Sequence, residues 1–146
     1  MSDTQIHHLG LTVGDVDRSV EFYTTLFGME ETTRGVADVA YVSAGVGVPN
    51  SKLVIAMLRG ETMRLELIQY AREAGNDSAP RNNDIGAAHV CFPVEDIDAT
   101  YSEFVAKGVE FIAPPSPSLG EGTSRFAYLR DPDGITVEIL QLSIDE

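Results

Sequence analysis

The fold is decided by His8–Asp17, HLGLTVGDVD, because this segment returns at a constant offset as His89–Asp98, HVCFPVEDID. The histidine, one valine and both aspartates are identical in the two copies. Each copy then runs through a helical pattern to a glycine, Gly28 in the first and Gly108 in the second. Identities at fixed spacing over a whole segment indicate a duplicated structural unit.

The two copies also end alike. Leu65–Gln69 reads LELIQ and Val137–Gln141 reads VEILQ, so each copy closes on an apolar segment that carries one glutamate and one glutamine. We therefore expect an α+β fold of two βαβββ modules, residues 1–72 and 87–146, joined by a linker over residues 73–86. The modules should pair into one curved, cupped mixed sheet with the helices on the outside.

Local patterns place the elements within each module. Leu9, Leu11 and Val13 alternate with polar or small residues, which is typical of a strand with one apolar face. Asp15 is the expected N-cap of a helix that ends at Gly28. An extended piece is expected from Met29 to about Gly35, followed by a loop with one helical turn. The other strands are expected at residues 52–59, 63–70, 88–94, 109–113, 125–130 and 136–142, with a second helix between 96 and 108.

Two further segments are rich in turn-forming residues. Asp131–Gly134, DPDG, is typical of a hairpin turn. Pro114–Gly122 combines proline, serine and glycine, and we expect it to form a mobile lip over a site.

The composition limits the classes of partner. The 146 residues include 23 acidic and 10 basic side chains, a formal net charge of −13. Such a field repels phosphate backbones, which argues against nucleic-acid binding. No apolar run approaches the roughly 20 residues that span a bilayer, and the start shows no signal peptide, so no membrane association is expected. The single cysteine, Cys91, fits a reducing compartment, and the expected location is cytoplasmic.

Four polar side chains on the predicted strands have the parity opposite to the apolar residues: His8, Glu66, His89 and Glu138. Because side chains alternate along a strand, all four should point away from the helices, into the concave face of the sheet. A carboxylate in an apolar strand is costly unless it is paired or binds a metal. Two nitrogen and two oxygen donors suit a divalent Ni, Co, Zn, Fe(II) or Mn ion. The sequence therefore predicts one divalent metal ion held by these four ligands.

Other residues on this face are candidates for contact with a substrate. Arg64 and Tyr70 share the face of Glu66, although solvent-facing positions at a sheet edge explain them equally well. Cys91 is a third candidate, and it also fits a small buried filler. His7 has the opposite parity, and we expect it to be an ordinary surface or packing residue.

The chain resembles the vicinal oxygen chelate superfamily, which contains glyoxalases, bleomycin resistance proteins and extradiol dioxygenases. The resemblance rests on His8 and Asp15, on Phe22–Tyr23, on Leu26–Gly28 and on the closing Asp131–Glu138, DPDGITVE, together with the repeat. It implies the paired-module fold and a metal ion on the four ligands named above. Glyoxalase I and methylmalonyl-CoA epimerase are the members that look most similar.

Three positions depart from the patterns of individual members. Thr12 stands where glyoxalase I usually has an arginine for glutathione. Asp131 stands where the epimerases have a histidine before proline. Glu66 stands where the extradiol dioxygenases need a histidine ligand, so the resemblance disfavours ring cleavage.

Two functional classes follow from these observations. The leading hypothesis is a metal-dependent isomerase, epimerase or lyase of the glyoxalase type, which acts on a small oxygen-chelating substrate by proton transfer next to a chelated carbonyl. Glu66 or Glu138 would move the proton and so be catalytic. The alternative is a non-catalytic protein of the same fold that sequesters a small molecule. Unpaired outer strands also predict a homodimer.

Overall fold

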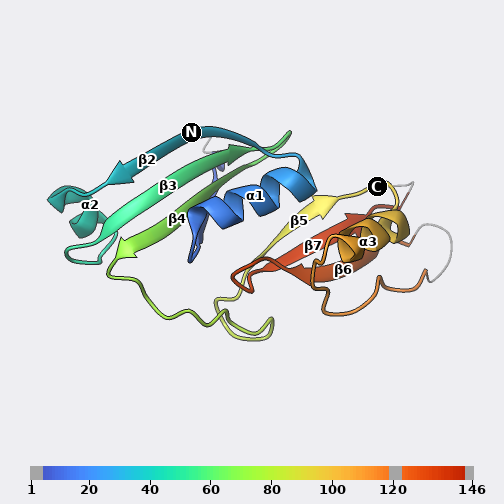
Figure 1. Cartoon of the computed structure of the whole chain (residues 1–146). Helices are drawn as coiled ribbons and strands as arrows, with labels where there is room; N and C mark the ends of the chain where they lie inside the picture. The colour runs from blue at the N-terminus through green and yellow to red at the C-terminus, as the bar shows by residue number, and fades with distance from the viewer. Residues whose placement is uncertain (1–4, 119–122, 144–146) are drawn as a thin grey trace. The chain divides into compact units, whose positions relative to one another are not determined.

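The computed structural model describes residues 5–118 and 123–143. The chain divides into two compact units, Met1–Asp77 and Ser78–Glu146 (Figure 1). Among the described residues, the first unit has two helices and the second has one, and each unit has its own mixed sheet, which is four-stranded in the first unit and three-stranded in the second. This organisation confirms the predicted α+β class.

The first unit contains the longer copy of the repeat. Its described elements are β1 (Leu9–Thr12), α1 (Val16–Phe27), β2 (Glu30–Ala37), α2 (Ala40–Gly45), β3 (Lys52–Arg59) and β4 (Arg64–Arg72). The strand order is β1-β4-β3-β2. β3 and β4 are joined by a short turn and run antiparallel, whereas β1 runs parallel to β4 and needs the long connection through α1.

The second unit repeats this plan with fewer strands. Its described elements are β5 (His89–Pro93), α3 (Ile97–Ala106), β6 (Arg125–Arg130) and β7 (Thr136–Gln141). The order β5-β7-β6 has the same pairing as β1-β4-β3, parallel for β5 with β7 and antiparallel for β6 with β7. The two units therefore share one pairing scheme, as a duplicated sequence predicts.

The strand predicted at residues 109–113 is wrong. Phe111 makes only an isolated bridge with Leu129. Pro114–Pro115 follow directly, and proline has no N–H group to donate to a neighbouring strand. The segment therefore forms no continuous strand beside β6: it makes this one bridge, and further along Ser116 N donates a backbone hydrogen bond to Phe126 O. Residues 119–122 of the predicted lip lie outside the described residues.

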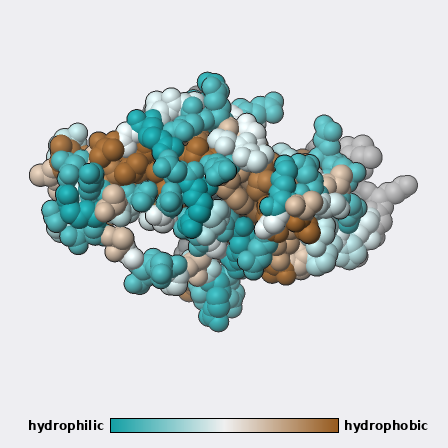
Figure 2. All heavy atoms as spheres, viewed as in Figure 1, coloured by the Kyte–Doolittle hydropathy of each residue, from teal (hydrophilic) through white to brown (hydrophobic). Residues whose placement is uncertain are grey.

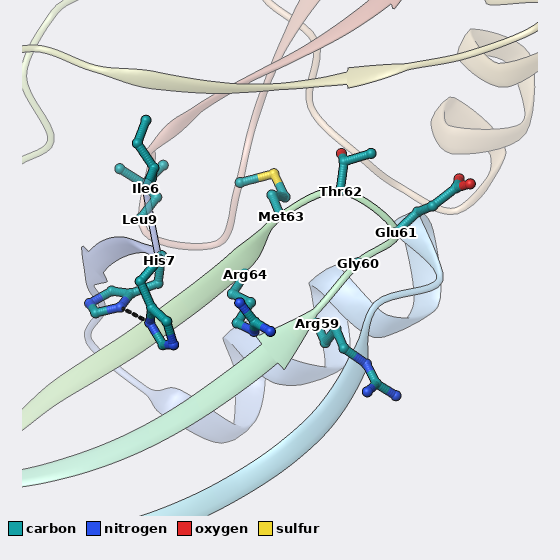
Figure 3. Close-up of a pocket in the computed structure, with 10 residues that line it drawn as sticks. Ile6, His7, Leu9, Arg59, Gly60, Glu61, Thr62, Met63 and Arg64 are labelled. Carbon is teal, nitrogen blue, oxygen red and sulfur yellow. Dashed lines mark hydrogen bonds between the residues drawn. The ribbon is translucent and has the colours of Figure 1, made fainter. Parts of the chain in front are cut away.

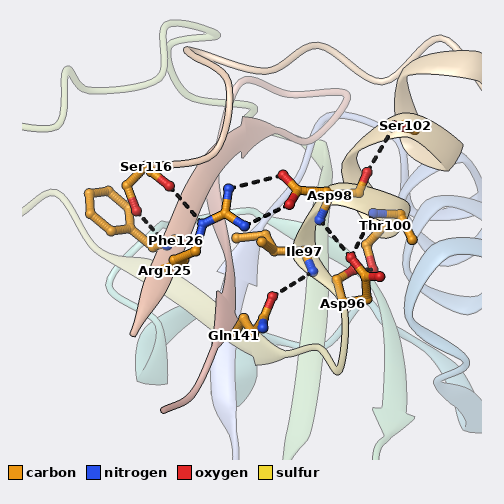
Figure 4. Close-up of polar contacts among 10 residues, drawn as sticks. Asp96, Ile97, Asp98, Thr100, Ser102, Ser116, Arg125, Phe126 and Gln141 are labelled. Carbon is orange, nitrogen blue, oxygen red and sulfur yellow. Dashed lines mark hydrogen bonds and ion pairs between the residues drawn. The ribbon is translucent and has the colours of Figure 1, made fainter. Parts of the chain in front are cut away.

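Both long helices begin in the same way. Asp15 and Asp96 are the N-caps of α1 and α3, and each carboxylate accepts hydrogen bonds from two backbone N–H groups of the first turn. Gln141 Oε1 accepts a further bond from Ile97 N at 3.0 Å (Figure 4), and Gln69 makes the equivalent bond in the first unit. The glutamine that closes each copy of the repeat thus ties the last strand of its unit to the start of its helix.

Alternation along the last strand of each unit separates the core from the candidate site. Leu65 and Leu67 of β4 are fully buried in the first unit, where α1 packs on β3 and β4. Val137 and Ile139 of β7 are fully buried in the second unit, where α3 packs on β6 and β7. The glutamate between the two apolar residues of each strand consequently lies on the opposite face of its sheet.

Hydrophilic side chains cover much of the face seen in Figure 2, in keeping with a formal net charge of −13. Strand β2 lies at the edge of its sheet and is exposed along nearly its whole length, and no strand of the described residues pairs with its outer edge. Among the described residues, no helix combines the length and the hydropathy needed to cross a membrane.

Candidate metal centre

In the first unit, a histidine and a glutamate meet where β1 begins beside β4. Nε2 of His8 lies 3.3 Å from Oε2 of Glu66. The register sets Gly10 opposite Glu66, and His8 is on the same face because it precedes Gly10 by two residues. The side chains of His8 and Glu66 are 36% and 24% exposed, so a ligand can reach both.

The second unit repeats this contact. Nε2 of His89 lies 3.0 Å from Oε2 of Glu138. The parallel pairing of β5 with β7 sets Cys91 opposite Glu138, as Gly10 faces the equivalent glutamate in the first unit. The same His–Glu contact therefore forms twice, at equivalent positions of two units.

The separation of the donors in each pair fits two neighbouring ligands of one metal ion. Ligand bonds of about 2.1 Å at right angles leave a nitrogen and an oxygen donor roughly 3.0 Å apart. The two pairs measure 3.3 and 3.0 Å. Within residues 5–118 and 123–143, no group of three or more His, Cys, Asp or Glu side chains gathers as a metal site. Each unit by itself therefore supplies half of the four-ligand set predicted from the sequence.

Glu138 is enclosed by two neighbours that can donate hydrogen bonds. Cys91 and Tyr128 are its cross-strand partners on β5 and β6, and the ring of Tyr128 lies 5.3 Å from that of His89. Burial and the nearby Glu138 raise the pKa of the Cys91 thiol to about 11. The same two causes raise the pKa of Tyr128. Both groups are therefore protonated at neutral pH.

The surroundings of Glu66 are more open. Met57 and Gly10 occupy the two cross-strand positions, and neither offers a polar side chain. A Cβ atom at Gly10 would lie 3.9 Å from Oε2 of Glu66, so even the smallest side chain there would touch the carboxylate. The Glu66 side chain is 24% exposed, against 15% for Glu138. Glu66 and Glu138 thus occupy equivalent positions of the repeat, but their surroundings differ.

His7 is exposed, as expected, but it also contacts the site. Its Nδ1 lies 2.8 Å from Nδ1 of His8, in an edge-to-face contact drawn as a dashed line in Figure 3. Nε2 of His8 faces Glu66, so coordination through that nitrogen would leave the imidazole proton on Nδ1. This N–H group would then donate to His7, which can fix both the tautomer and the ring orientation of His8.

The three candidate substrate-binding residues have different surroundings. Arg64 lines a pocket of about 660 Å³ together with His8. Tyr70 is half-buried on β4 and is not part of this lining. Cys91 is half-buried beside Glu138. Arg64 therefore shares a pocket with the predicted metal ligand His8. Tyr128 was not identified from the sequence as a neighbour of the site. Aligning β6 with β3 could have identified it, because Tyr128 then takes the place of Met57, which lies opposite Glu66.

Residues 5–139 match a family model described as the Glyoxalase/Bleomycin resistance protein/Dioxygenase superfamily. A 2-epi-5-epi-valiolone epimerase from Actinomyces sp is 33% identical over 147 residues, which cover 94% of this chain and 79% of that protein. A probable lactoylglutathione lyase from Vibrio cholerae is 31% identical over 142 residues, which cover 97% and 93% of the two chains. The matched residues include all four predicted metal ligands.

A solved structure has a similar fold. It is a glyoxalase family protein from Bacillus cereus, with a TM-score of 0.82 and 21% sequence identity. The superposition covers 98% of this chain and 99% of that one, so the likeness extends over both units.

Proposed function

The chain belongs to the glyoxalase/bleomycin resistance protein/dioxygenase superfamily, and we propose that it is a divalent-metal-dependent lyase or isomerase. Its substrate is a small molecule with two adjacent oxygens, and a proton is transferred at the carbon beside one of them. The observation that carries this proposal is the His–Glu contact that forms at equivalent positions of two repeated units. Relatives named as an epimerase and a lyase support these two reaction classes.

In this proposal the metal ligands are His8, Glu66, His89 and Glu138. The two pairs serve one ion when a first unit meets a second unit, either of the same chain or of the partner in a dimer. Imidazole and carboxylate donors in equal number suit Ni, Co, Zn, Fe(II) or Mn and are too rich in nitrogen for calcium. A divalent ion bound there would polarise a carbonyl oxygen and so acidify the carbon beside it.

A carboxylate moves the proton, and Glu138 is the better placed of the two. Its side chain is the less exposed, at 15% against 24% for Glu66, so water competes less for it. Tyr128 and Cys91 have raised pKa values, so they stand beside it as hydrogen-bond donors and do not compete as bases. A base must lie within hydrogen-bond reach of the proton that it takes, so the reacting carbon faces this side of β7.

Exchange of a substrate proton with deuterated water tests the proposal. The metal-reconstituted protein is offered a panel of 2-oxo and 2-hydroxy acids and thioesters, and deuterium uptake is followed by NMR. Glu138→Gln keeps an oxygen donor and removes the base, so it should retain some metal and lose exchange by about 100-fold or more. Glu103→Gln, an exposed change on α3 that breaks only a pair with Lys107, should exchange like the wild type.

The exchange experiment tests both which glutamate is the base and whether the protein is an enzyme. Unchanged exchange in Glu138→Gln with metal still bound would move the base to Glu66. No exchange by the wild type with any compound of the panel would contradict the enzymatic proposal.

The alternative function is sequestration of a small molecule without turnover. The formal net charge of −13 favours it for cationic compounds, because an acidic protein concentrates them at its surface. A sequestering protein has no need of a stoichiometric metal ion at the two His–Glu pairs. Elemental analysis of the purified, metal-treated protein therefore separates the two classes before any substrate is known.

A further inference from the structure

A pocket of about 660 Å³ opens in the first unit between the segment that leads into β1 and the turn that joins β3 to β4 (Figure 3). Its lining consists of Ile6, His7, His8, Leu9 and residues 59–64. The pocket shares His8 with the candidate metal centre. A molecule bound at the His8–Glu66 pair therefore has this pocket beside it.

Arg64 places a positive charge in this pocket. Arg59, at the other end of the turn, is neutralised by Glu30, whose carboxylate lies 2.6 Å from its guanidinium. Figure 3 shows the carboxylate of Glu61 directed away from Arg64. Within the part of the chain that the structure describes, the guanidinium of Arg64 makes no hydrogen bond or ion pair. Other arginines bind a carboxylate, namely Arg34, Arg72, Arg81 and Arg125.

We infer that Arg64 binds a carboxylate of the substrate while the candidate metal centre holds two adjacent oxygens of the same molecule. This role rests on the proposed function. Arg64 and Glu66 are two residues apart on one face of β4, a spacing of roughly 7 Å that a molecule of a few carbons can bridge. A guanidinium can donate two parallel hydrogen bonds to a carboxylate. Half-buried Leu9 and Met63 line the same pocket and offer apolar contact to the carbons between.

The charge of the whole chain explains why such a contact is needed. With 23 acidic against 10 basic side chains, the protein repels an anionic substrate. An unpaired guanidinium at the site offsets this repulsion locally. The predicted substrate class is therefore a small oxygen-chelating molecule with a separate carboxylate, and not a neutral compound.

Two hydroxamates that differ by one carboxylate test the inference. Propionohydroxamate offers two adjacent oxygens to a metal ion, and the monohydroxamate of succinic acid adds a terminal carboxylate. Calorimetry on the full chain loaded with Co²⁺ or Zn²⁺ should give an affinity about tenfold or more higher for the carboxylated compound. Arg64→Gln should abolish this preference and leave the affinity for propionohydroxamate unchanged. Arg72→Gln, the same change at the far end of β4 where the arginine pairs with Asp38, should keep the preference.

Two other results of the hydroxamate experiment would contradict the inference. Equal affinities in the wild type, or a preference that survives in Arg64→Gln, would overturn the role of Arg64 and leave the proposed function standing. Failure of both hydroxamates to bind the metal-treated wild type would overturn the proposed function and the role of Arg64 together.

Discussion

Glu138 and Glu66 hold equivalent places in the two units, but only Glu138 has polar side chains at its two cross-strand positions. Cys91 and Tyr128 stand beside it, where the first unit has a glycine and a methionine. Burial at these positions, with the carboxylate close by, raises the pKa of both groups. The environment of Glu138 can therefore be measured through the thiol next to it.

We expect the Cys91 thiol to react slowly with iodoacetamide in the metal-free protein. Its pKa of about 11 keeps it protonated, whereas the thiolate is the nucleophile. The alkylation rate should rise about tenfold per pH unit from about pH 7.5 to 9.5 without levelling off. A plateau near the ordinary thiol pKa of about 8.5 would contradict this environment.

The same pKa has a consequence for stability. Because the folded-state pKa of Cys91 lies above that of an unfolded thiol, the neutral form is the one that the fold favours. The contribution of Cys91 to the free energy of unfolding is fully present below about pH 8.5, the pKa of an unfolded thiol. It is lost as the pH rises toward the folded-state pKa of about 11.

Replacing His7 should weaken metal binding without touching a ligand. In His7→Ala, the Nδ1–H group of His8 loses its partner, and the loss of such an outer hydrogen bond typically lowers metal affinity about 10–100-fold. His7→Gln keeps an acceptor and should recover part of the affinity. Competition with a chelator gives the affinities, and an unchanged value in His7→Ala would show that His7 does not orient His8.

Strand alternation placed His8 and Glu66 on one face of the sheet, and they are in contact there. It did not identify His7 or Tyr128 as neighbours of the two pairs. The reason is physical: periodicity tells which face a side chain occupies, but contacts between strands depend on register, and His7 precedes the strand altogether.

The N-caps of the two long helices should contribute comparably to stability. Asp15→Ala and Asp96→Ala each remove an acceptor for two backbone N–H groups, and such a loss costs about 1 kcal/mol of the free energy of unfolding. Ser102→Ala is the matched control, because its hydroxyl only donates back to Asp98 O within α3. Urea denaturation measures all three, and equal midpoints for Asp96→Ala and the control would contradict the capping role.

The predicted bounds of helices and strands agree with the structure where turn-forming residues mark the ends of an element. The strands predicted at residues 52–59 and 125–130 are β3 and β6 with the same bounds, and Asp131–Gly134 forms the predicted turn, with Gly134 at φ 80°. The strand predicted at 109–113 was wrong, because the prolines that follow it limit backbone pairing. The loop with one helical turn expected after Gly35 contains α2 (Ala40–Gly45).

We predict that the protein is a homodimer. The outer strand β2 is eight residues long and exposed, and one of its edges pairs with no strand that the structure describes. Such edges are usually covered by a partner. Light scattering at micromolar concentration should give about twice the chain mass of 15.8 kDa. A mass equal to that of one chain would rule the dimer out.

Co-expression of two metal-site variants shows which chains supply each metal ion. His8→Ala impairs the first unit and Glu138→Ala impairs the second. If each metal ion is shared between chains, a mixed dimer has one site made of the intact first unit of one chain and the intact second unit of the other. That site has both His–Glu pairs and binds metal. If each chain binds its own ion, the mixed sample stays as metal-poor as the separate variants.

Metal stoichiometry decides whether the two His–Glu pairs act together. Elemental analysis of the reconstituted wild type should find one ion per chain, and His8→Ala and Glu138→Ala should each abolish stoichiometric binding although they lie in different units. Both side chains lie on the face opposite the buried leucines and valine, so circular dichroism should show a retained fold. Glu103→Ala, which removes an exposed carboxylate of α3, should keep its metal. Full occupancy in both His8→Ala and Glu138→Ala would show that these pairs do not hold the ion.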